Sequence, residues 1–211
     1  MPTVTQVLRR FPQVFTHPYG IGRAVRDQFI HFRRSPLDRE IPWFSYCAID
    51  FLEQYLQLRM SVYEFGSGGS TLWLAARVAK LVTIEERAEW ADAVSERLDR
   101  RGLRHRVEIR LREPDRSSPT AFAASPYAQA LPDEPADVIV IDGCERRSHD
   151  DLRPVAFHLA EERVRPGGLI VVDDAKRYPQ LRHQNRARDI RACWGFGPCR
   201  YDRAETDIFV Y

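Results

Sequence analysis

Residues 62–75 read VYEFGSGGSTLWLA, in which three glycines and two serines separate an apolar run from a helix-like run. Glycine and serine are weak helix formers, so their presence where a helix should start needs another reason. Gly66 and Gly68 lack a Cβ atom, which allows unusual backbone angles and the close approach of a ligand. The following helix would add free N–H groups and the positive end of its dipole. We therefore predict a ligand-binding loop at residues 66–70.

Downstream of this loop, short apolar runs alternate with helical patterns. We expect strands at 62–65, 81–84, 107–111, 138–141 and 169–172, and helices at 71–79, 88–101 and about 149–163. Such alternation is typical of βαβ units with right-handed crossovers. In the tail, WGFGPCRY and ETDIFVY lie too close together for a crossover helix and predict an antiparallel hairpin. The predicted fold class is α/β, with a Rossmann-like, mostly parallel sheet, helices on both faces and a C-terminal antiparallel hairpin.

The chain of 211 residues divides into two predicted parts. Residues 1–58 predict a helical and loop extension that packs on the core, and residues 59–211 predict the α/β domain. Residues 23–34 (RAVRDQFIHFRR) have the spacing of a short amphipathic helix. This helix would pack on the domain, which we favour, or contact an anionic membrane surface. A second helix is expected behind a Ser45 cap.

Composition excludes several classes of protein. The hydrophobic content of 44% fits an ordinary globular protein, and no apolar run approaches the length of a membrane span. The N-terminus has no continuous apolar core, so a secretory signal is not expected and a cytoplasmic location is. The net charge of +2 gives no reason to expect nucleic acid as a partner. The four cysteines show no CxxC spacing, so neither a zinc site nor a redox pair is expected.

An acidic side chain ends the second predicted strand, where nucleotide-binding folds recognise ribose. Glu85 lies 19 residues after Gly66, and a carboxylate there can accept hydrogen bonds from both ribose hydroxyls. A dinucleotide site favours the pattern G-x-G-x-x-G, but Thr71 stands at the third glycine position. Glu85 alone does not choose between nucleoside cofactors, so an NAD(P)-dependent oxidoreductase stays an alternative.

Two later segments add carboxylates at strand ends. ADVIVIDG places Asp142 after the fourth strand, and VRPGGLIVVDDAKRY places Asp173 and Asp174 after the fifth. Together with YEFGSGGST and VTIEE, these segments resemble the class I S-adenosylmethionine-dependent methyltransferases over about residues 61–211. The similarity is greatest to small O-methyltransferase-like members, whose strands also end in IDG and PGG…DD or DN.

The resemblance implies roles for the loop and strand-end residues. Gly66, Ser67 and Gly68 would line the methionine portion of S-adenosylmethionine, Glu64 would help to hold its amino group, and Glu85 would bind ribose. Residues 111–113 would lie near adenine. The implied activity is methyl transfer to an oxygen, less readily to a nitrogen, of a small-molecule acceptor. A non-catalytic cofactor-binding or interaction domain on the same fold stays open.

The acidic residues Asp142, Asp173 and Asp174 match the places where catechol-type O-methyltransferases hold Mg²⁺. Oxygen ligands suit such a cation. The sequence departs from that type because Asp174 replaces an Asn and Glu145 replaces a Lys. Three carboxylates at short range need either a metal or cationic side chains to neutralise them. We favour a cationic clamp, with Arg146, Arg147, Lys176 and Arg177 as candidates.

An oxygen nucleophile also needs a base or a metal to take its proton. The candidate catalytic residues are Asp142, His149 and Lys176, with Glu145 as a further candidate, and Asp142 would also orient the cofactor or the acceptor. Arginines at the predicted rim suit an acidic acceptor, and sugar-like or phenolic acceptors stay open. These arginines are Arg146, Arg147, Arg177 and Arg182. The sequence allows a homodimer without specifying one.

Overall fold

The computed structural model describes residues 20–31, 34–143, 152–200 and 202–211. The helices are α2 Ile21–Ile30, α3 Pro36–Arg39, α4 Tyr46–Tyr55, α5 Gly69–Ala75, α6 Ala88–Arg100, α7 Pro119–Ala124 and α8 Leu152–Glu161. The strands are β1 Ser61–Phe65, β2 Lys80–Glu85, β3 Val107–Leu111, β4 Ala136–Ile141, β5 Val164–Val172, β6 Asp189–Gly195 and β7 Ala204–Val210. Short 3₁₀ turns lie at Arg104–Arg106, Ala128–Ala130, Ala175–Arg177 and Pro179–Arg182.

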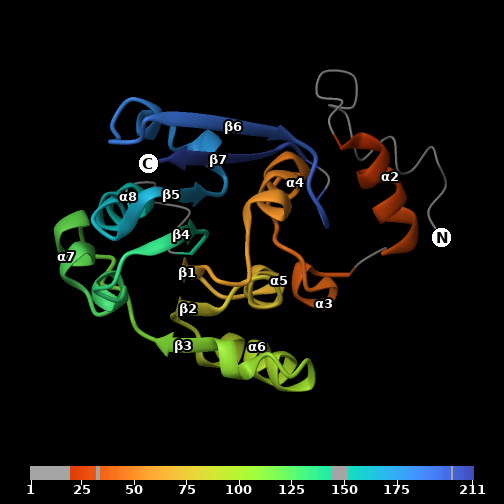
Figure 1. Ribbon diagram of the computed structural model, residues 1–211, viewed down its shortest axis with the longest axis horizontal. Coiled ribbons are helices and arrows are strands. Elements are labelled where there is room, and N and C mark those ends of the chain that lie inside the picture. The colour runs from red at the N-terminus through yellow and green to blue at the C-terminus, as the bar shows by residue number, and fades with distance from the viewer. Residues whose placement is uncertain (1–19, 32–33, 144–151, 201) are drawn as a thin grey trace.

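All seven strands form one sheet in the order β3-β2-β1-β4-β5-β7-β6 (Figure 1). Strands β1 to β5 pair in parallel, whereas β7 pairs antiparallel with both β5 and β6. This confirms the predicted fold class and the terminal hairpin. The order reverses between β1 and β4, and in such sheets a crevice for ligands opens at the carboxyl ends of the strands at this reversal.

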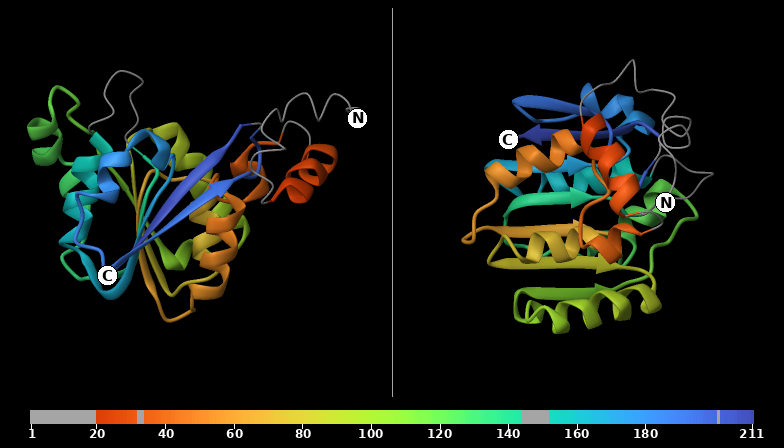
Figure 2. Two further views of the ribbon diagram at one scale, coloured as in Figure 1. Left: turned by 90° about the horizontal axis from the view of Figure 1, so that it is seen from above. Right: turned by 90° about the vertical axis from the view of Figure 1, so that its right-hand side faces the viewer.

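The strands are buried because helices cover both faces of the sheet (Figure 2). Strand β4 shows the reason in its sequence, since Val138, Ile139, Val140 and Ile141 form a continuous apolar run and none is exposed. Val138 and Val140 face the core under α4 and α5, while Ile139 and Ile141 face the core under α7 and α8. A strand covered on both sides has no polar alternation, which is why such runs predict a parallel sheet.

The first strand of the hairpin begins earlier than predicted. Strand β6 covers Asp189–Gly195, so only the first two residues of WGFGPCRY belong to it. Residues 196–200 lie outside the strand, and there Gly197 packs against the carbonyl oxygen of Phe44, where an added Cβ would sit 2.5 Å from that atom. The Pro-Gly-Gly segment, in turn, lies inside β5, where the register with β4 shifts and Gly167 has φ 82°.

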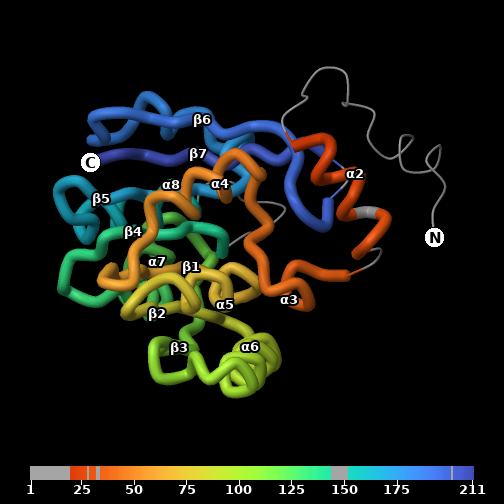
Figure 3. Tube along the Cα trace, turned by 45° about the vertical axis from the view of Figure 1, so that its right-hand side comes forward, coloured from red at the N-terminus to blue at the C-terminus, as the bar shows by residue number. Residues whose placement is uncertain are grey.

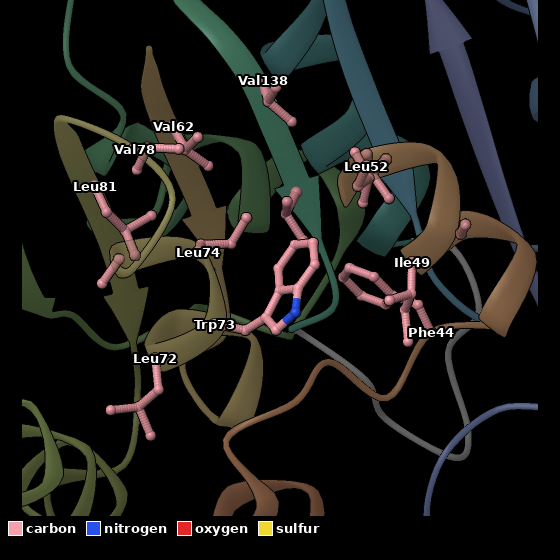
Figure 4. Close-up of a cluster of buried hydrophobic side chains, with 14 of the residues drawn as sticks. Phe44, Ile49, Leu52, Val62, Leu72, Trp73, Leu74, Val78, Leu81 and Val138 are labelled. Atoms are coloured by element: carbon pink, nitrogen blue, oxygen red, sulfur yellow. The ribbon is translucent and has the colours of Figure 1, made fainter. Parts of the chain in front are cut away.

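Helix α4 fastens the N-terminal segment to the sheet. Ser45 caps this helix as predicted, and its hydroxyl also donates to the Cys193 carbonyl at 3.0 Å. The Ser45 N–H donates to the Thr206 hydroxyl at 3.0 Å, which ties α4 to β7. In Figure 4, Phe44 and Ile49 face Trp73 of α5 within the same core. Residues of the predicted extension therefore contribute to the core, and the boundary at residue 58 stays a prediction.

The thiols of Cys47 on α4 and Cys193 on β6 lie 2.9 Å apart, a proximity that spacing along the sequence does not reveal.

Helix α2 packs on the domain, the alternative that we favoured for residues 23–34. Its Ala24 is buried, and its Asp27 accepts hydrogen bonds from the Tyr46 hydroxyl and, at 2.9 Å, from Arg39. Arg39, at the end of α3, also places Nη1 3.8 Å from the Sγ atom of Cys199. The connection between β6 and β7 therefore runs beside α3 (Figure 3). Within the described ranges, no helix is long and apolar enough to cross a membrane.

Two neighbouring glycines allow a test of this packing. An added Cβ at Gly69 would overlap the carbonyl oxygens of Pro36 and Ile41, so Gly69→Ala should lower the free energy of unfolding by about 1–3 kcal/mol. The matched control is Gly68→Ala, whose Cβ would meet its nearest described atom, Trp90 Nε1, only at 3.7 Å. Urea denaturation of both variants measures the difference. Equal stabilities would contradict the close approach of the N-terminal segment to α5.

Candidate active site at the carboxyl ends of the strands

Two neighbouring cavities open at the carboxyl ends of the strands. The larger, of about 440 Å³, lies between the loop after β1, the ends of β4 and β5, and the N-terminal segment. The smaller, of about 170 Å³, lies between the same loop and the end of β2. Ser67, Trp90 and Asp142 line both cavities, so a ligand could extend from one into the other.

The glycines of the loop after β1 serve different purposes. Gly66 has φ 89°, and a Cβ there would lie 2.7 Å from the Cα of Gly143, so the protein's own backbone excludes a side chain. At Gly69 the excluding atoms belong to the N-terminal segment. Gly68 alone faces a cavity without a close protein neighbour. The expectation of close ligand approach therefore applies to Gly68, whereas at Gly66 we attribute the glycine to contact with Gly143.

Glu85 lines the smaller cavity and holds the loop in place. Its Oε2 accepts hydrogen bonds from the Ser67 N–H at 2.9 Å and the Ser67 hydroxyl at 2.7 Å. Its Oε1 accepts from the N–H groups of Glu86 and Arg87 at 2.9 and 3.0 Å. The carboxylate is thus oriented by backbone donors, and ribose hydroxyls would have to take the place of the Ser67 hydroxyl. The ribose role stays a prediction.

Glu64 is fully buried beneath the loop and lines neither cavity. Its Oε2 accepts from the Thr71 hydroxyl at 2.7 Å, and the same hydroxyl accepts from the Gly68 N–H at 2.8 Å. Its Oε1 has no hydrogen-bond partner in the described part of the chain. Burial raises the pKa of Glu64 to about 7, although nearby hydroxyl groups oppose this shift. In this geometry Glu64 positions the loop from below, and a contact with the cofactor's amino group stays a prediction.

The three predicted carboxylates lie together. The parallel pairing of Ile141 with Val172 places Asp142 and Asp173 side by side at the ends of β4 and β5. Asp174 follows in a left-handed conformation with φ 50°. Asp142, Asp173 and Asp174 all line the larger cavity, as the order of strands four and five predicted.

Two arginines that the sequence did not single out neutralise these carboxylates. Arg153 of α8 places Nη2 3.3 Å from Asp142 Oδ1 and donates Nη1 to the Asp173 carbonyl at 2.6 Å. Arg200, between β6 and β7, donates Nη2 to Asp174 Oδ1 at 3.0 Å. Their side chains are only 2% and 11% exposed. Arg153 and Arg200 thus supply most of the described cationic contacts, and Lys176, one of the candidates proposed from the sequence, adds a positive charge that lowers the pKa of Asp174.

The other predicted basic residues do not line the larger cavity or lie outside the described residues. Lys176 donates to the Arg203 carbonyl at 3.3 Å and does not line the larger cavity. Arg182 is bound to Asp207 and Glu205, with distances of 2.7 and 2.6 Å. Arg177 lies with its guanidinium 5.7 Å from the Tyr178 ring. The segment that holds Glu145, Arg146, Arg147 and His149 is outside the described residues.

Burial and charge separate the pKa values of the adjacent acids. Burial, followed by the charges of Asp142 and Asp174, raises the pKa of Asp173 to about 8. Burial also opposes the charged form of Asp174, but the guanidinium of Arg200 prevails and lowers its pKa. One carboxyl of the pair is thus held neutral more readily than the other, which is typical of acids that share one site.

The donor set does not fit the Mg²⁺ site of the catechol type. Among the residues described, no group of three His, Cys, Asp or Glu side chains is arranged to hold a metal ion. Asp173 Oδ1 accepts from the Thr206 hydroxyl at 2.8 Å, and Asp173 Oδ2 faces Arg200 at 3.8 Å. Asp174 is paired with the same arginine. A divalent cation among these oxygens would lie beside two guanidinium groups that repel it.

The chain resembles known proteins in both its sequence and its fold. A family model described as a methyltransferase domain matches residues 63–175, more than half of the sequence. The chain belongs to the methyltransferase-domain family. The matched region begins in β1 and ends just after Asp174, so it contains the loop, Glu85 and all three carboxylates. The resemblance to class I S-adenosylmethionine-dependent methyltransferases is thereby confirmed.

Solved structures share the methyltransferase fold at low sequence identity. The O-methyltransferase TomG from Streptomyces achromogenes, in complex with SAM, has a TM-score of 0.61 and 19% identity over 90% of this chain and 96% of its own. SMU.1697c, a putative methyltransferase from Streptococcus mutans in complex with SAH, has a TM-score of 0.57 and 13% sequence identity, over 78% of this chain and 96% of its own. A putative rRNA-methylase from Clostridium thermocellum has a TM-score of 0.55 and 13% sequence identity, over 77% of this chain and 93% of its own. No curated protein matches the sequence significantly.

Several cavity-lining residues gave no signal in the sequence. Leu37, Ile41 and Trp43 form an apolar wall of the larger cavity, although they precede the α/β domain in the chain. Trp90 of α6 donates Nε1 to the Ser67 carbonyl at 2.5 Å and lines both cavities. A tryptophan shortly after Glu85 could have been flagged, because a helix that starts at this strand end lies beside the loop. Residues 111–113, predicted near adenine, line neither cavity, whereas Tyr127 lines the smaller one.

The buried Glu64 gives a prediction for ligand-free protein. Because its folded-state pKa is raised, its contribution to stability is full below pH 4.5 and is lost as the pH rises through about 7. Glu64→Gln removes this titration. The free energy of unfolding of the variant relative to wild type should therefore rise by up to about 3 kcal/mol between pH 4.5 and about pH 8. Urea denaturation across this range measures it, and a pH-independent difference would contradict the assignment.

Proposed function

We propose that the protein transfers the methyl group of S-adenosylmethionine to an oxygen of a small-molecule acceptor. The observation that carries this proposal is the pair of cavities joined at Ser67, Trp90 and Asp142, in a chain of the methyltransferase-domain family. The larger cavity, of about 440 Å³, has the size of a ligand pocket, and the smaller, of about 170 Å³, would hold part of a nucleoside that extends from one cavity into the other.

The residues around the smaller cavity fit the adenosine portion of the cofactor. Glu85 presents an oriented carboxylate for ribose, and Tyr127, buried against Phe65, contributes to the wall of the cavity. In the larger cavity, the vacant Cβ position of Gly68 leaves room for the methionine portion. Asp142, with a side chain 29% exposed, lies at the junction and supplies a negative charge for the amino group or the acceptor. These features support the cofactor roles inferred from the resemblance.

When bound, S-adenosylmethionine supplies an electrophilic methyl group on a positively charged sulfur. The protein then has to place the acceptor oxygen in line, exclude water and remove a proton. Leu37, Ile41 and Trp43 supply an apolar wall of the larger cavity, against which an acceptor would displace water. Asp142 is the described residue best placed to accept the proton, because it lines both cavities. His149 stays a candidate outside the described residues, and Lys176, which does not line the larger cavity, is less well placed than Asp142.

The charges of the cavity favour a neutral acceptor with an apolar or aromatic part. Arg153 and Arg200 line the larger cavity, but each faces carboxylates of the same site. Arg182 is likewise bound to two acids. The described arginines therefore give less support to an acidic acceptor than the sequence suggested. Trp43, whose surface is 47% exposed, offers a face for stacking instead.

Ligand-dependent stability distinguishes this proposal from an NAD(P)-dependent oxidoreductase. S-adenosylhomocysteine should raise the melting temperature, and at 100 times its Kd it should add about 2.7 kcal/mol to the free energy of unfolding. NAD should produce no shift. Differential scanning fluorimetry and calorimetry measure both effects.

The matched control is Gly68→Val, which should fold like wild type but lose most of its affinity for S-adenosylhomocysteine. Its side chain would enter the larger cavity rather than the protein core. Equal shifts with NAD and S-adenosylhomocysteine would refute the choice of cofactor, and an unchanged affinity of Gly68→Val would remove the loop from the site.

A further inference from the structure

Arg200 is the cation on the acceptor side of the acidic cluster formed by Asp142, Asp173 and Asp174. Its Nη2 donates to Asp174 Oδ1 at 3.0 Å, and its Nη1 lies 3.8 Å from Asp173 Oδ2. On the opposite side, Arg153 reaches Asp142 Oδ1 at 3.3 Å. Two guanidinium groups carry the charge of one divalent cation. The two guanidinium groups therefore supply the same positive charge to the cluster as a bound Mg²⁺ would.

Further contacts hold the guanidinium of Arg200 in this position. Its Nη1 also donates to the Trp43 carbonyl at 3.3 Å, and its Nε donates to Asp202 Oδ1 at 3.3 Å. The Trp43 ring lies 5.5 Å from the guanidinium carbon. The preceding residue, Cys199, adopts a left-handed conformation with φ 59°, and Gly197 lies against the Phe44 carbonyl. Contacts between the N-terminal segment and the β6–β7 connection thus place this charge before any ligand binds.

A metal ion would compete with Arg200 for the same oxygens. Mg²⁺ requires near-octahedral oxygen ligands at about 2.0–2.1 Å. Asp174 Oδ1 is hydrogen-bonded to the guanidinium, and Asp173 Oδ1 is hydrogen-bonded to Thr206. The repulsion between a divalent ion and a buried guanidinium is strong because little water screens it. Binding of the ion would require the arginine side chain to leave.

We propose that Arg200 replaces the divalent cation of catechol-type methyltransferases, so that this site holds its three carboxylates without a metal and binds one only when the guanidinium is removed. The proposal rests on the proposed function in that it takes the larger cavity as the methyl-transfer site. It identifies Arg200 as a positioning residue that fixes the charge and orientation of Asp173 and Asp174 beside the acceptor.

The test is Mn²⁺ binding, followed by electron paramagnetic resonance of the free ion, for wild type and two variants. Arg200→Met removes the charge but keeps an apolar chain against Trp43. Arg200→Lys keeps the charge and is the matched control. Wild type and Arg200→Lys should leave Mn²⁺ free, whereas Arg200→Met should bind one ion at least about tenfold more tightly. Adding Asp174→Asn to Arg200→Met should reverse this gain.

Two results would overturn the proposal. One is binding of Mn²⁺ to wild type that Asp174→Asn abolishes, and this measurement decides the matter even if Arg200→Met fails to fold. The other is an Arg200→Met variant that folds, as judged by circular dichroism, and gains no affinity for Mn²⁺. Titration of the same wild-type sample with S-adenosylhomocysteine tests the proposed function independently. If wild type does not bind S-adenosylhomocysteine, the proposed function is refuted, but the result on Mn²⁺ binding is unchanged.

Discussion

The backbones of Gly66 and Gly143 meet where the strand order of the sheet reverses, and the candidate site depends on this contact. The Gly143 N–H donates to the Phe65 carbonyl at 2.6 Å, and no Cβ fits on either glycine. Because β1 and β4 end so close together, the residues next to these glycines, Ser67 and Asp142, line the same two cavities. A side chain at either glycine would separate the two strand ends and, with them, the two halves of the site.

Buried acids then hold this arrangement from below and from the side. Glu64 fixes the first turn of α5 through Thr71, and Glu85 fixes Ser67 and the chain entering α6. Acids used in this way must be oriented before a ligand arrives, which favours tight binding because less order remains to be imposed. The same principle applies to the acidic cluster on the other side, where Arg153 and Arg200 supply the charge that keeps neighbouring carboxylates together.

The sequence predicted the features that depend on local pattern. The apolar run of β4 gave a doubly covered strand, and the positions of Glu85, Asp142 and Asp173 followed because parallel strands present their carboxyl ends at one edge. It could not predict Arg200, because this residue reaches Asp174 only through the packing of Gly197 against Phe44, far apart in the chain. The apolar wall from Leu37 to Trp43 was missed for the same reason, as was the contact of Gly66 with Gly143, 77 residues away. Gly66 also lines the smaller cavity, so its cofactor role stays a prediction.

The central claim is that the ends of β1, β2 and β4 form a binding site for a methyl-donor nucleoside. The most direct measurement is calorimetric titration of S-adenosylhomocysteine into Glu85→Ala and Glu86→Ala. Glu85→Ala should weaken binding by about 1–3 kcal/mol, since the ribose hydroxyls and the Ser67 loop both lose their acceptor. Glu86→Ala should change affinity much less, because the Glu86 side chain pairs with Arg116 and does not hold the Ser67 loop, although Glu86 also lines the smaller cavity. Equal losses, or a larger loss for Glu86→Ala, would contradict the account.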